Sequence, residues 1–243
     1  MLQEQERAAA EGSAPSLLLR ILRAAEFVLL FFGVPLLYVF RALPLRTVIP
    51  VLILFSLACL ALLLRDRSFD RRRLWNGADF GKRLVRVLAV YLVAGAALLA
   101  LVLVLDRNRA AQGKPELFLS FVKRSTVGWM IVMSLYPLLS VYPQELIFRA
   151  FLFHRYRALF PEPWMQVCAS AVAFGFVHVL FRNWVAVVLS ALGGFLFART
   201  YRRTDSLLMS GVEHALYGDL IFTVGLGTFF YHGTARFVSS ITG

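Results

Sequence analysis

Six ionisable side chains interrupt the apolar segments in the second half of this 243-residue sequence. They are Glu145, Arg149, His178, Glu213, His214 and Asp219. An ionisable group at membrane depth is costly, so such groups usually mark a proton path, a binding partner or a reaction site. Carboxylates and imidazoles near one another can hold a water molecule and remove its proton. These residue types therefore point first to hydrolysis or proton transfer inside a membrane.

Glu145 and Arg149 lie four residues apart, which places them on one helix face with the carboxylate on the favourable N-terminal side. A pair that only neutralises itself explains this spacing as well as a catalytic pair does. Pro137 and Pro143 favour the functional interpretation. They interrupt helical hydrogen bonding just before Gln144, and interrupted helices at membrane depth usually line a cavity or pack on protein.

His178 and His214 lie on two further apolar segments, where a single histidine is more often a packed residue than a catalyst. Their depth favours a shared site. At about 1.5 Å per residue, Glu145, His178 and His214 lie about 15, 21 and 14 Å from the predicted cytosolic ends of their helices. Three helices thus bring these side chains to one level of the membrane, which predicts a cluster.

The segment around His214 holds further candidates. On a helix, Glu213 and Tyr217 share one face, while His214 and Gly218 share another. Asp219 is rotated by about 140° from His214. Glu213, Tyr217 and Asp219 are therefore auxiliary candidates, not central ones.

These residues suggest two kinds of hydrolysis. In the first, Glu145 and one of the two imidazoles activate a water molecule that attacks a peptide carbonyl, and the second imidazole stabilises the oxyanion. Arg149 would hold Glu145 ionised and oriented, and no cofactor is needed. In the second, Glu145, His178 and His214 bind a catalytic zinc ion, although the sequence contains no H-E-x-x-H motif.

The elements that must position these residues are transmembrane helices. The sequence is 59% hydrophobic and only 16% charged, unlike a soluble domain of this length. Seven long apolar runs predict an all-α, polytopic membrane protein of about seven transmembrane helices with the active-site bundle in the C-terminal half. The runs cover about 21–40, 47–64, 84–105, 127–148, 164–181, 183–199 and 206–230. The break at 181–183 predicts a tight helical hairpin.

The net charge of +12 does not indicate nucleic-acid binding, because the basic residues cluster in loops between apolar runs. Most of the 26 lysines and arginines fall on one side if the N-terminus is cytosolic, which predicts an N-in, C-out orientation and contact with anionic lipid. We expect a flexible cytosolic tail over residues 1–20 and a single transmembrane domain over 21–243.

Three short patterns occur in order on separate predicted helices: Gln144-Glu145-x-x-x-Arg149, Phe174-x-x-x-His178 and His214-x-x-x-Gly218. Together they resemble the motifs E-E-x-x-x-R, F-x-x-x-H and H-x-x-x-N of the CPBP-type intramembrane proteases. This is the CAAX-processing and bacteriocin-related group, also called Abi. The similarity covers about residues 125–230. It implies an all-helical fold with a conical cavity open to the cytosolic leaflet, and a glutamate-dependent endopeptidase.

The resemblance also implies roles for individual positions. The water activators would be Gln144 and His178, and the oxyanion site would be His214 and Gly218. Two of these four residues depart from the family pattern, since Gln144 cannot act as a base and Gly218 has no side-chain donor.

Neighbouring residues could compensate for both departures. Glu145 or Glu213 could serve as the base, and Tyr217 or Asp219 could replace the missing asparagine. We therefore expect an intramembrane endopeptidase of glutamic type that acts on a membrane protein or peptide, in a bacterial inner membrane. In this enzyme Glu145 with His178 would activate water, and His214 would stabilise the oxyanion. The alternatives are an inactive homologue that acts as a scaffold or peptide-binding protein, a zinc-dependent protease, and, last, a proton-coupled transporter.

Overall fold

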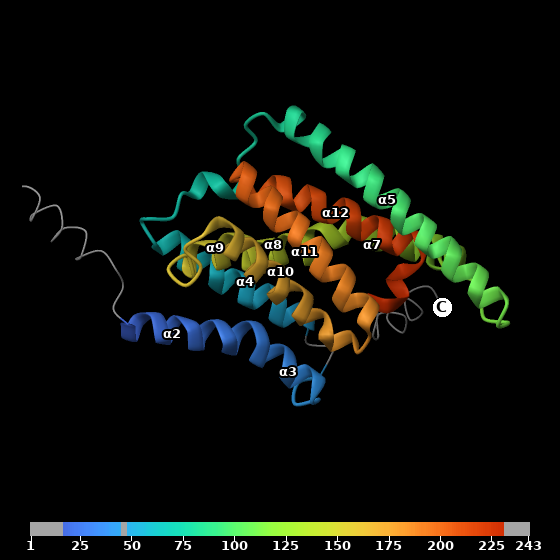
Figure 1. Cartoon of the computed structure of the whole chain (residues 1–243), viewed down its shortest axis with the longest axis horizontal. Coiled ribbons are helices and arrows are strands. Elements are labelled where there is room, and N and C mark those ends of the chain that lie inside the picture. Colours follow the sequence, from blue (N-terminus) through green and yellow to red (C-terminus); the bar gives the residue numbers. More distant parts are fainter. Residues whose placement is uncertain (1–16, 45–47, 231–243) are drawn as a thin grey trace, which may run out of the picture.

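The computed structural model describes residues 17–44 and 48–230, and the regular elements in these ranges are all helical (Figure 1). Helix α2 begins at Leu17, so residues 17–20 of the expected tail belong to it, and residues 1–16 lie outside the described ranges. In chain order the elements are α2 (Leu17–Val28), η1 (Leu29–Gly33), α3 (Val34–Val39), α4 (Val48–Arg65), η3 (Arg71–Leu74), α5 (Phe80–Ala110), α6 (Ser120–Arg124), α7 (Thr126–Tyr136), η4 (Pro137–Val141), α8 (Tyr142–Glu145), η5 (Leu146–Phe151), α9 (Leu152–Arg155), α10 (Pro163–Val177), η6 (His178–Phe181), α11 (Trp184–Thr204), α12 (Leu207–Val224) and η7 (Leu226–Phe230).

Five helical stretches within the described ranges are long and apolar enough to cross a membrane. They are Val48–Arg65, Phe80–Ala110, Thr126–Arg155, Pro163–Phe181 and Trp184–Thr204. Large apolar side chains such as Leu92 and Leu192 are exposed on these helices, as contact with lipid tails requires. The protein is thus an integral membrane protein whose described part is all-helical.

The other two apolar runs also form helices, in α2 to α3 and in α12, but these do not meet the same criterion. Helix α2 carries Arg20, Arg23 and Glu26, and α12 carries Glu213 and Asp219. These charges lower the hydropathy of both helices. The predicted count of seven spans is therefore not confirmed, and the N-in orientation stays a prediction.

Helices α10 and α11 form the predicted antiparallel hairpin and pack closely along their length. The turn between them contains Arg182 in the left-handed region, with φ 57°, and the side chain of Asn183 caps α11 by accepting a hydrogen bond from the Ala186 N–H. Gly175 permits the close approach of the two helices, because a Cβ atom there would lie 2.7 Å from the Cβ of Ala191. The hairpin prediction is confirmed.

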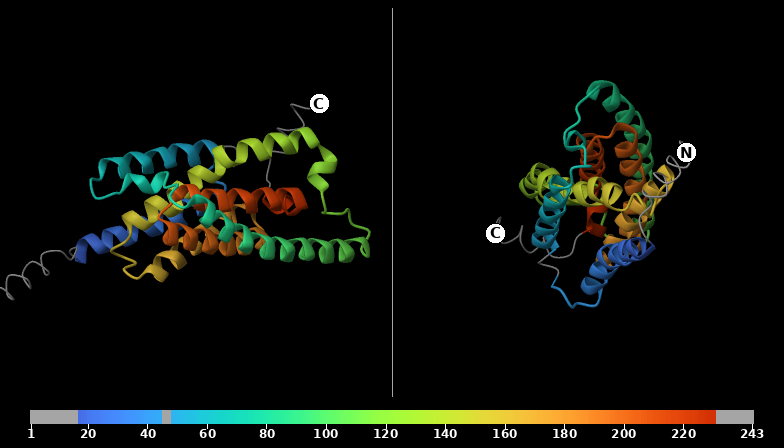
Figure 2. Two further views of the ribbon diagram at one scale, coloured as in Figure 1. Left: turned by 90° about the horizontal axis from the view of Figure 1, so that it is seen from above. Right: turned by 90° about the vertical axis from the view of Figure 1, so that its left-hand side faces the viewer.

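Helix α12 lies at the centre of the arrangement, where it packs against α5 and α11 and also contacts α7, η4 and α8. In Figure 1 the α2–α3 segment and α5 run along opposite edges, with α10, α11 and α12 between them, and the right-hand view of Figure 2 shows α5 and the α2–α3 segment at opposite edges again. Aromatic side chains fill the interior between these helices. Phe148, Phe151, Phe174 and Phe197 are all buried there.

The stretch Thr126–Arg155 is continuous, although Pro137 and Pro143 were expected to interrupt it. Each side of α8 instead has a wider π-helical turn, η4 and η5, in which the N–H of Tyr142 bonds the carbonyl of Pro137 and the N–H of Leu152 bonds that of Ile147. Such turns are frequent at functional sites. They rotate the short helix α8 relative to its neighbours and so set the direction of the Glu145 side chain.

Candidate active site

Glu145 is fully buried on α8, with 0% of its surface exposed. Its Oε1 atom accepts a hydrogen bond from Nδ1 of His214 at 3.0 Å and lies 3.3 Å from Nη2 of Arg149. The predicted pairing of Glu145 with Arg149 on one helix face is therefore present. The structure adds His214, a residue 69 positions away in the sequence.

Arg149 is also fully buried, and several groups fix its guanidinium. Its Nη1 donates to Oγ of Ser170 at 2.9 Å, and Ser170 in turn donates to the carbonyl of Phe148 at 2.7 Å. The cation lies 4.8 Å from the centre of the Phe174 ring and 5.7 Å from that of Phe197. These contacts suit Arg149 to neutralise and orient the neighbouring carboxylate.

His214 extends this arrangement into α7. Its ring stacks on Phe197 with centroids 4.5 Å apart, and Phe174 meets it edge to face at 5.3 Å. The acceptor Glu145 fixes the proton of His214 on Nδ1, so Nε2 carries a lone pair. That atom lies 3.2 Å from the hydroxyl of Tyr136. We call Glu145, Arg149, Ser170, His214 and Tyr136 the central cluster.

Tyr136 was not among the residues that the sequence singled out. A tyrosine before a proline in an apolar segment carries no chemical signal by itself. The usable signal was Gly218, which leaves space where the resembling family has a side chain. A Cβ atom at Gly218 would lie only 2.3 to 2.6 Å from atoms of the Tyr136 ring, so the phenol of Tyr136 fills that space.

His178 lies at the end of α10, where its Nδ1 atom is 2.7 Å from the carbonyl oxygen of Phe174. A carbonyl can only accept, so Nδ1 is the donor and Nε2 is left with a lone pair. The ring of Phe174 contacts both imidazoles, with centroids 4.9 Å from His178 and 5.3 Å from His214. The structure thus places His178 beside the central cluster but joins Glu145 to His214.

The remaining candidates, Gln144, Glu213, Tyr217 and Asp219, lie outside the central cluster. The Nε2 atom of Gln144 donates to Oγ of Ser140 at 2.6 Å, so its side chain is tied to its own helix. Tyr217 packs its ring against Tyr91 at 5.3 Å, while Glu213 is 2% exposed and Asp219 is partly buried. No hydrogen bond joins Glu213, Tyr217 or Asp219 to the central cluster within the described residues.

A zinc site was the alternative use of Glu145, His178 and His214. Within residues 17–44 and 48–230, no three or more His, Cys, Asp or Glu side chains are grouped so that they could hold a metal ion. The hydrogen bonds described above explain why these three are not such a group. One imidazole nitrogen of His214 is directed to Glu145 and the other to Tyr136, and His178 is held by a backbone carbonyl.

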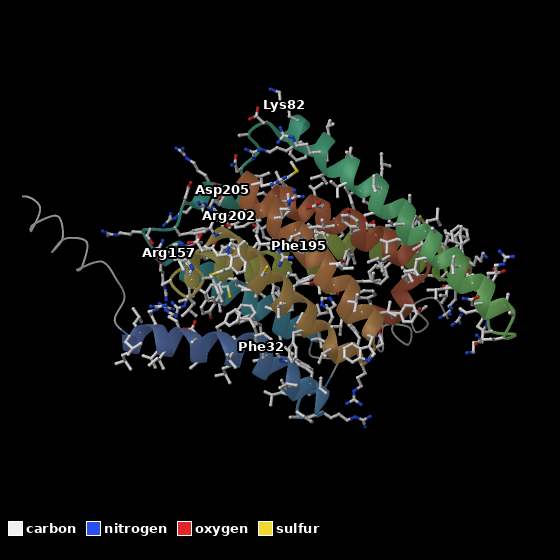
Figure 3. The ribbon with its side chains drawn as sticks, viewed as in Figure 1. Phe32, Lys82, Arg157, Phe195, Arg202 and Asp205 are labelled. Carbon is white, nitrogen blue, oxygen red and sulfur yellow. The ribbon has the colours of Figure 1, made fainter. Side chains whose placement is uncertain are left out.

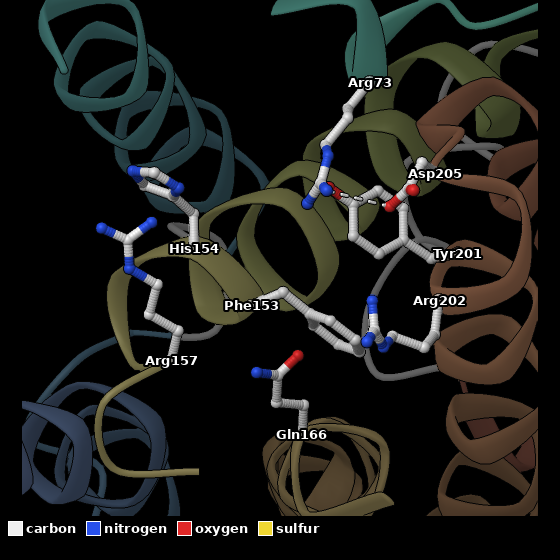
Figure 4. Close-up of a pocket in the computed structure, with 8 residues that line it drawn as sticks. All are labelled: Arg73, Phe153, His154, Arg157, Gln166, Tyr201, Arg202 and Asp205. Atoms are coloured by element: carbon white, nitrogen blue, oxygen red, sulfur yellow. Dashed lines mark ion pairs between the residues drawn. The ribbon is translucent and has the colours of Figure 1, made fainter. Parts of the chain in front are cut away.

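A cavity of about 210 Å³ lies at the end of the bundle that the charge pattern predicts to be cytosolic (Figures 3 and 4). Within it, Arg73 forms an ion pair with Asp205 at 3.2 Å, and Phe153 packs edge to face on Tyr201. Its lining residues are Arg73, Phe153, His154, Arg157, Gln166, Tyr201, Arg202 and Asp205. None of these residues belongs to the central cluster.

Comparison with known proteins supports the resemblance seen in the motifs. No curated protein and no solved structure matches the chain. Residues 125–218 match the family model described as type II CAAX prenyl endopeptidase Rce1-like. The matched segment begins one residue before α7 and ends at Gly218, so it contains the whole central cluster. Over residues 125–218, this chain is therefore similar to the Rce1-like family of type II CAAX prenyl endopeptidases.

Proposed function

We propose that this protein is an intramembrane endopeptidase that hydrolyses a membrane-associated peptide near its C-terminus, with His214 as the base and Glu145 as its orienting carboxylate. The observation that carries this proposal is the 3.0 Å hydrogen bond between Nδ1 of His214 and Oε1 of Glu145. A buried carboxylate that holds one imidazole nitrogen makes the other nitrogen a stronger and better-directed base.

The hydrolysis would proceed by general base catalysis. A proton leaves water for Nε2 of His214 as the water oxygen bonds to the peptide carbonyl carbon, and the carbonyl electrons move to oxygen. The imidazolium formed is stabilised by Glu145. When the intermediate collapses, the carbon–nitrogen bond breaks and the proton passes from His214 to the leaving amine. No covalent enzyme intermediate is needed.

The other site residues serve this step. Arg149 keeps Glu145 ionised in a buried position, and Ser170 holds Arg149 in place. His178, with its proton on Nδ1, presents the lone pair of Nε2, which can accept a hydrogen bond from the peptide N–H. Gln144 can donate a hydrogen bond but cannot take a proton. We place the protein in a bacterial inner membrane, with the arginine-rich loop before α5 in the cytosol.

The test uses the full-length protein in liposomes with prenylated and unprenylated peptides that end in a CAAX sequence. Glu145→Gln and His214→Ala should each lower kcat/KM by about 10²–10⁴-fold. Glu116→Gln is the control, since that carboxylate is 67% exposed and pairs with Lys123 near the surface. Comparison of membrane-protein termini in cells with wild type or His178→Ala would identify the natural substrate. Equal cleavage by wild type and His214→Ala would refute the proposal.

A second function is favoured by the packing of the site. Glu145 and Arg149 are fully buried and His214 is only 5% exposed, so the central cluster could stabilise a protein that binds peptides without cutting them. Gln144→Glu separates the two functions. A wild-type protein that already cleaves contradicts the scaffold, whereas a Gln144→Glu variant that cleaves when wild type does not would support it.

A further inference from the structure

The imidazole of His214 is enclosed, and this limits how a water proton can reach it. One ring face is covered by Phe197, and the edge of Phe174 meets the ring at 89°. Nδ1 is bonded to Glu145, and Nε2 faces the hydroxyl of Tyr136 at 3.2 Å. Because the phenol oxygen occupies the direction of the Nε2 lone pair, the approach of water to that nitrogen leads through Tyr136.

The position of Tyr136 is fixed by packing, not only by this hydrogen bond. Its ring lies against the backbone of Gly218, where any larger residue would collide with it. On another side it meets Phe222 edge to face, with centroids 5.4 Å apart. The hydroxyl is therefore held against His214 by two residues of α12, Gly218 and Phe222, and only its hydrogen is free to turn.

The direction of each hydrogen bond follows from the acceptor at one end. The carboxylate of Glu145 can only accept, so His214 donates from Nδ1 and accepts at Nε2. Tyr136 must then donate its hydroxyl hydrogen to Nε2. The lone pairs of the phenol oxygen point away from His214 and can accept a hydrogen bond from a further donor such as water.

We infer that Tyr136 is a catalytic proton relay between the attacking water and His214. This inference rests on the proposed function. As the water oxygen bonds to the carbonyl carbon, the water gives a proton to the phenol oxygen, and the phenol gives its own proton to Nε2. The two transfers leave Tyr136 neutral and His214 protonated. In the second half of the reaction the same path runs backwards and delivers a proton to the leaving amine nitrogen.

The experiment compares Tyr136→Phe with Tyr91→Phe in the full-length protein in liposomes. Both changes remove one phenol hydroxyl from a tyrosine that packs against α12, but Tyr91 contacts Tyr217 and not His214. Tyr136→Phe should lower kcat by about 10²–10³-fold with KM nearly unchanged, because the hydroxyl acts in the chemical step. Tyr91→Phe should stay within about threefold of wild type. A larger solvent deuterium effect on kcat in wild type than in Tyr136→Phe would show two moving protons.

The outcomes separate the relay from the function on which it depends. If Tyr136→Phe keeps wild-type kcat while His214→Ala is inactive, the relay is wrong and the proposed function stands. If wild type cleaves no peptide, or if His214→Ala cleaves as well as wild type, both the relay and the proposed function are wrong. If Tyr136→Phe does not fold, Gly218→Ala replaces it, since that change moves the ring but keeps the hydroxyl. Full kcat in Gly218→Ala would then overturn the relay.

Discussion

Glu26 and Glu145 are both paired with an arginine, yet their surroundings differ. Glu26 lies at the end of the bundle, where Arg155 binds it through both Nε and Nη2 at 2.9 Å, and Tyr156 adds a hydrogen bond at 3.0 Å. Its side chain is 29% exposed. Glu145 is fully buried, and Arg149 approaches only one of its oxygens, which it shares with His214.

This difference indicates what each cluster is for. We call Glu26, Arg155 and Tyr156 the end cluster. The bidentate bond from Arg155 pairs both carboxylate oxygens of Glu26 and leaves neither free to take part in a reaction. The end cluster therefore serves to join helix α2 to the end of α9. In the central cluster, Nε of Arg149 is buried without a hydrogen-bond partner among the described residues. The carboxylate there uses its free capacity to orient an imidazole. Incomplete pairing of buried groups costs stability and is expected at functional sites.

The largest predicted effect comes from removing each arginine. Arg149→Met leaves the carboxylate of Glu145 buried without its cation, which should lower the free energy of unfolding by about 3–5 kcal/mol. Arg155→Met exposes Glu26 to water at the bundle end, so the loss should be about 1 kcal/mol or less. Thermal unfolding of both variants in detergent measures the comparison.

Glu145→Gln provides the control for that pair of variants. Combined with Arg149→Met it removes both buried charges, so the double variant should be more stable than Arg149→Met alone. Equal losses for Arg149→Met and Arg155→Met would show that burial does not distinguish the two clusters.

A smaller effect on the free energy of unfolding is expected at Ser170. The end cluster contains no equivalent of this residue. Ser170→Ala removes the acceptor of Arg149 Nη1 and the donor to the Phe148 carbonyl, and should cost about 1–3 kcal/mol. It should also lower kcat, since Arg149 loses one of its fixed contacts. Ser134→Ala is the matched control, because that residue is exposed and its hydroxyl donates to the carbonyl of Met130 in its own helix. An unchanged melting temperature in Ser170→Ala would contradict the prediction.

Two glycines of α12 test the position of Tyr136 against the general effect of a helical glycine. Gly211→Ala adds a Cβ atom to open space and should stabilise the helix by about 0.5–1 kcal/mol. Gly218→Ala places its Cβ 2.3 Å from the Tyr136 ring and should instead destabilise the protein by about 1–3 kcal/mol. Opposite signs in the melting temperature support the close contact, and two equal gains would disprove it.

Much of the fold followed from local patterns in the sequence. Apolar length predicted the five helices that are long and apolar enough to cross a membrane, and the Phe181-Arg182-Asn183 break predicted the hairpin. The Glu145–Arg149 pair followed from helical spacing alone. The spans at either end could not be settled this way, since the charges in α2 and α12 make their hydropathy ambiguous.

The pairing within the site could not be predicted, for physical reasons. Depth placed Glu145 level with both histidines, but the choice of His214 depends on the rotation of α8 between two π-helical turns. No pattern in this sequence predicts those turns, and Pro137 and Pro143 suggested an interrupted helix instead. Tyr136 was missed because its role depends on the absence of a side chain at Gly218, on another helix.

The smallest predicted effect on stability concerns Asp66, an exposed residue directly after α4. This effect depends on pH. A hydrogen bond from His154 at 2.8 Å, helped by two from Ser68, holds the pKa of Asp66 well below its usual range. The unfolded carboxyl has a pKa of about 3.9, so its contribution to stability is present above that pH and is lost as the pH falls towards the folded pKa. Asp66→Asn should therefore melt slightly below wild type at pH 6, and the gap should close as the pH falls below about 4. A gap that stayed constant or widened on acidification would contradict this contribution of Asp66, because the central cluster is the same in both proteins and cannot change the difference between them.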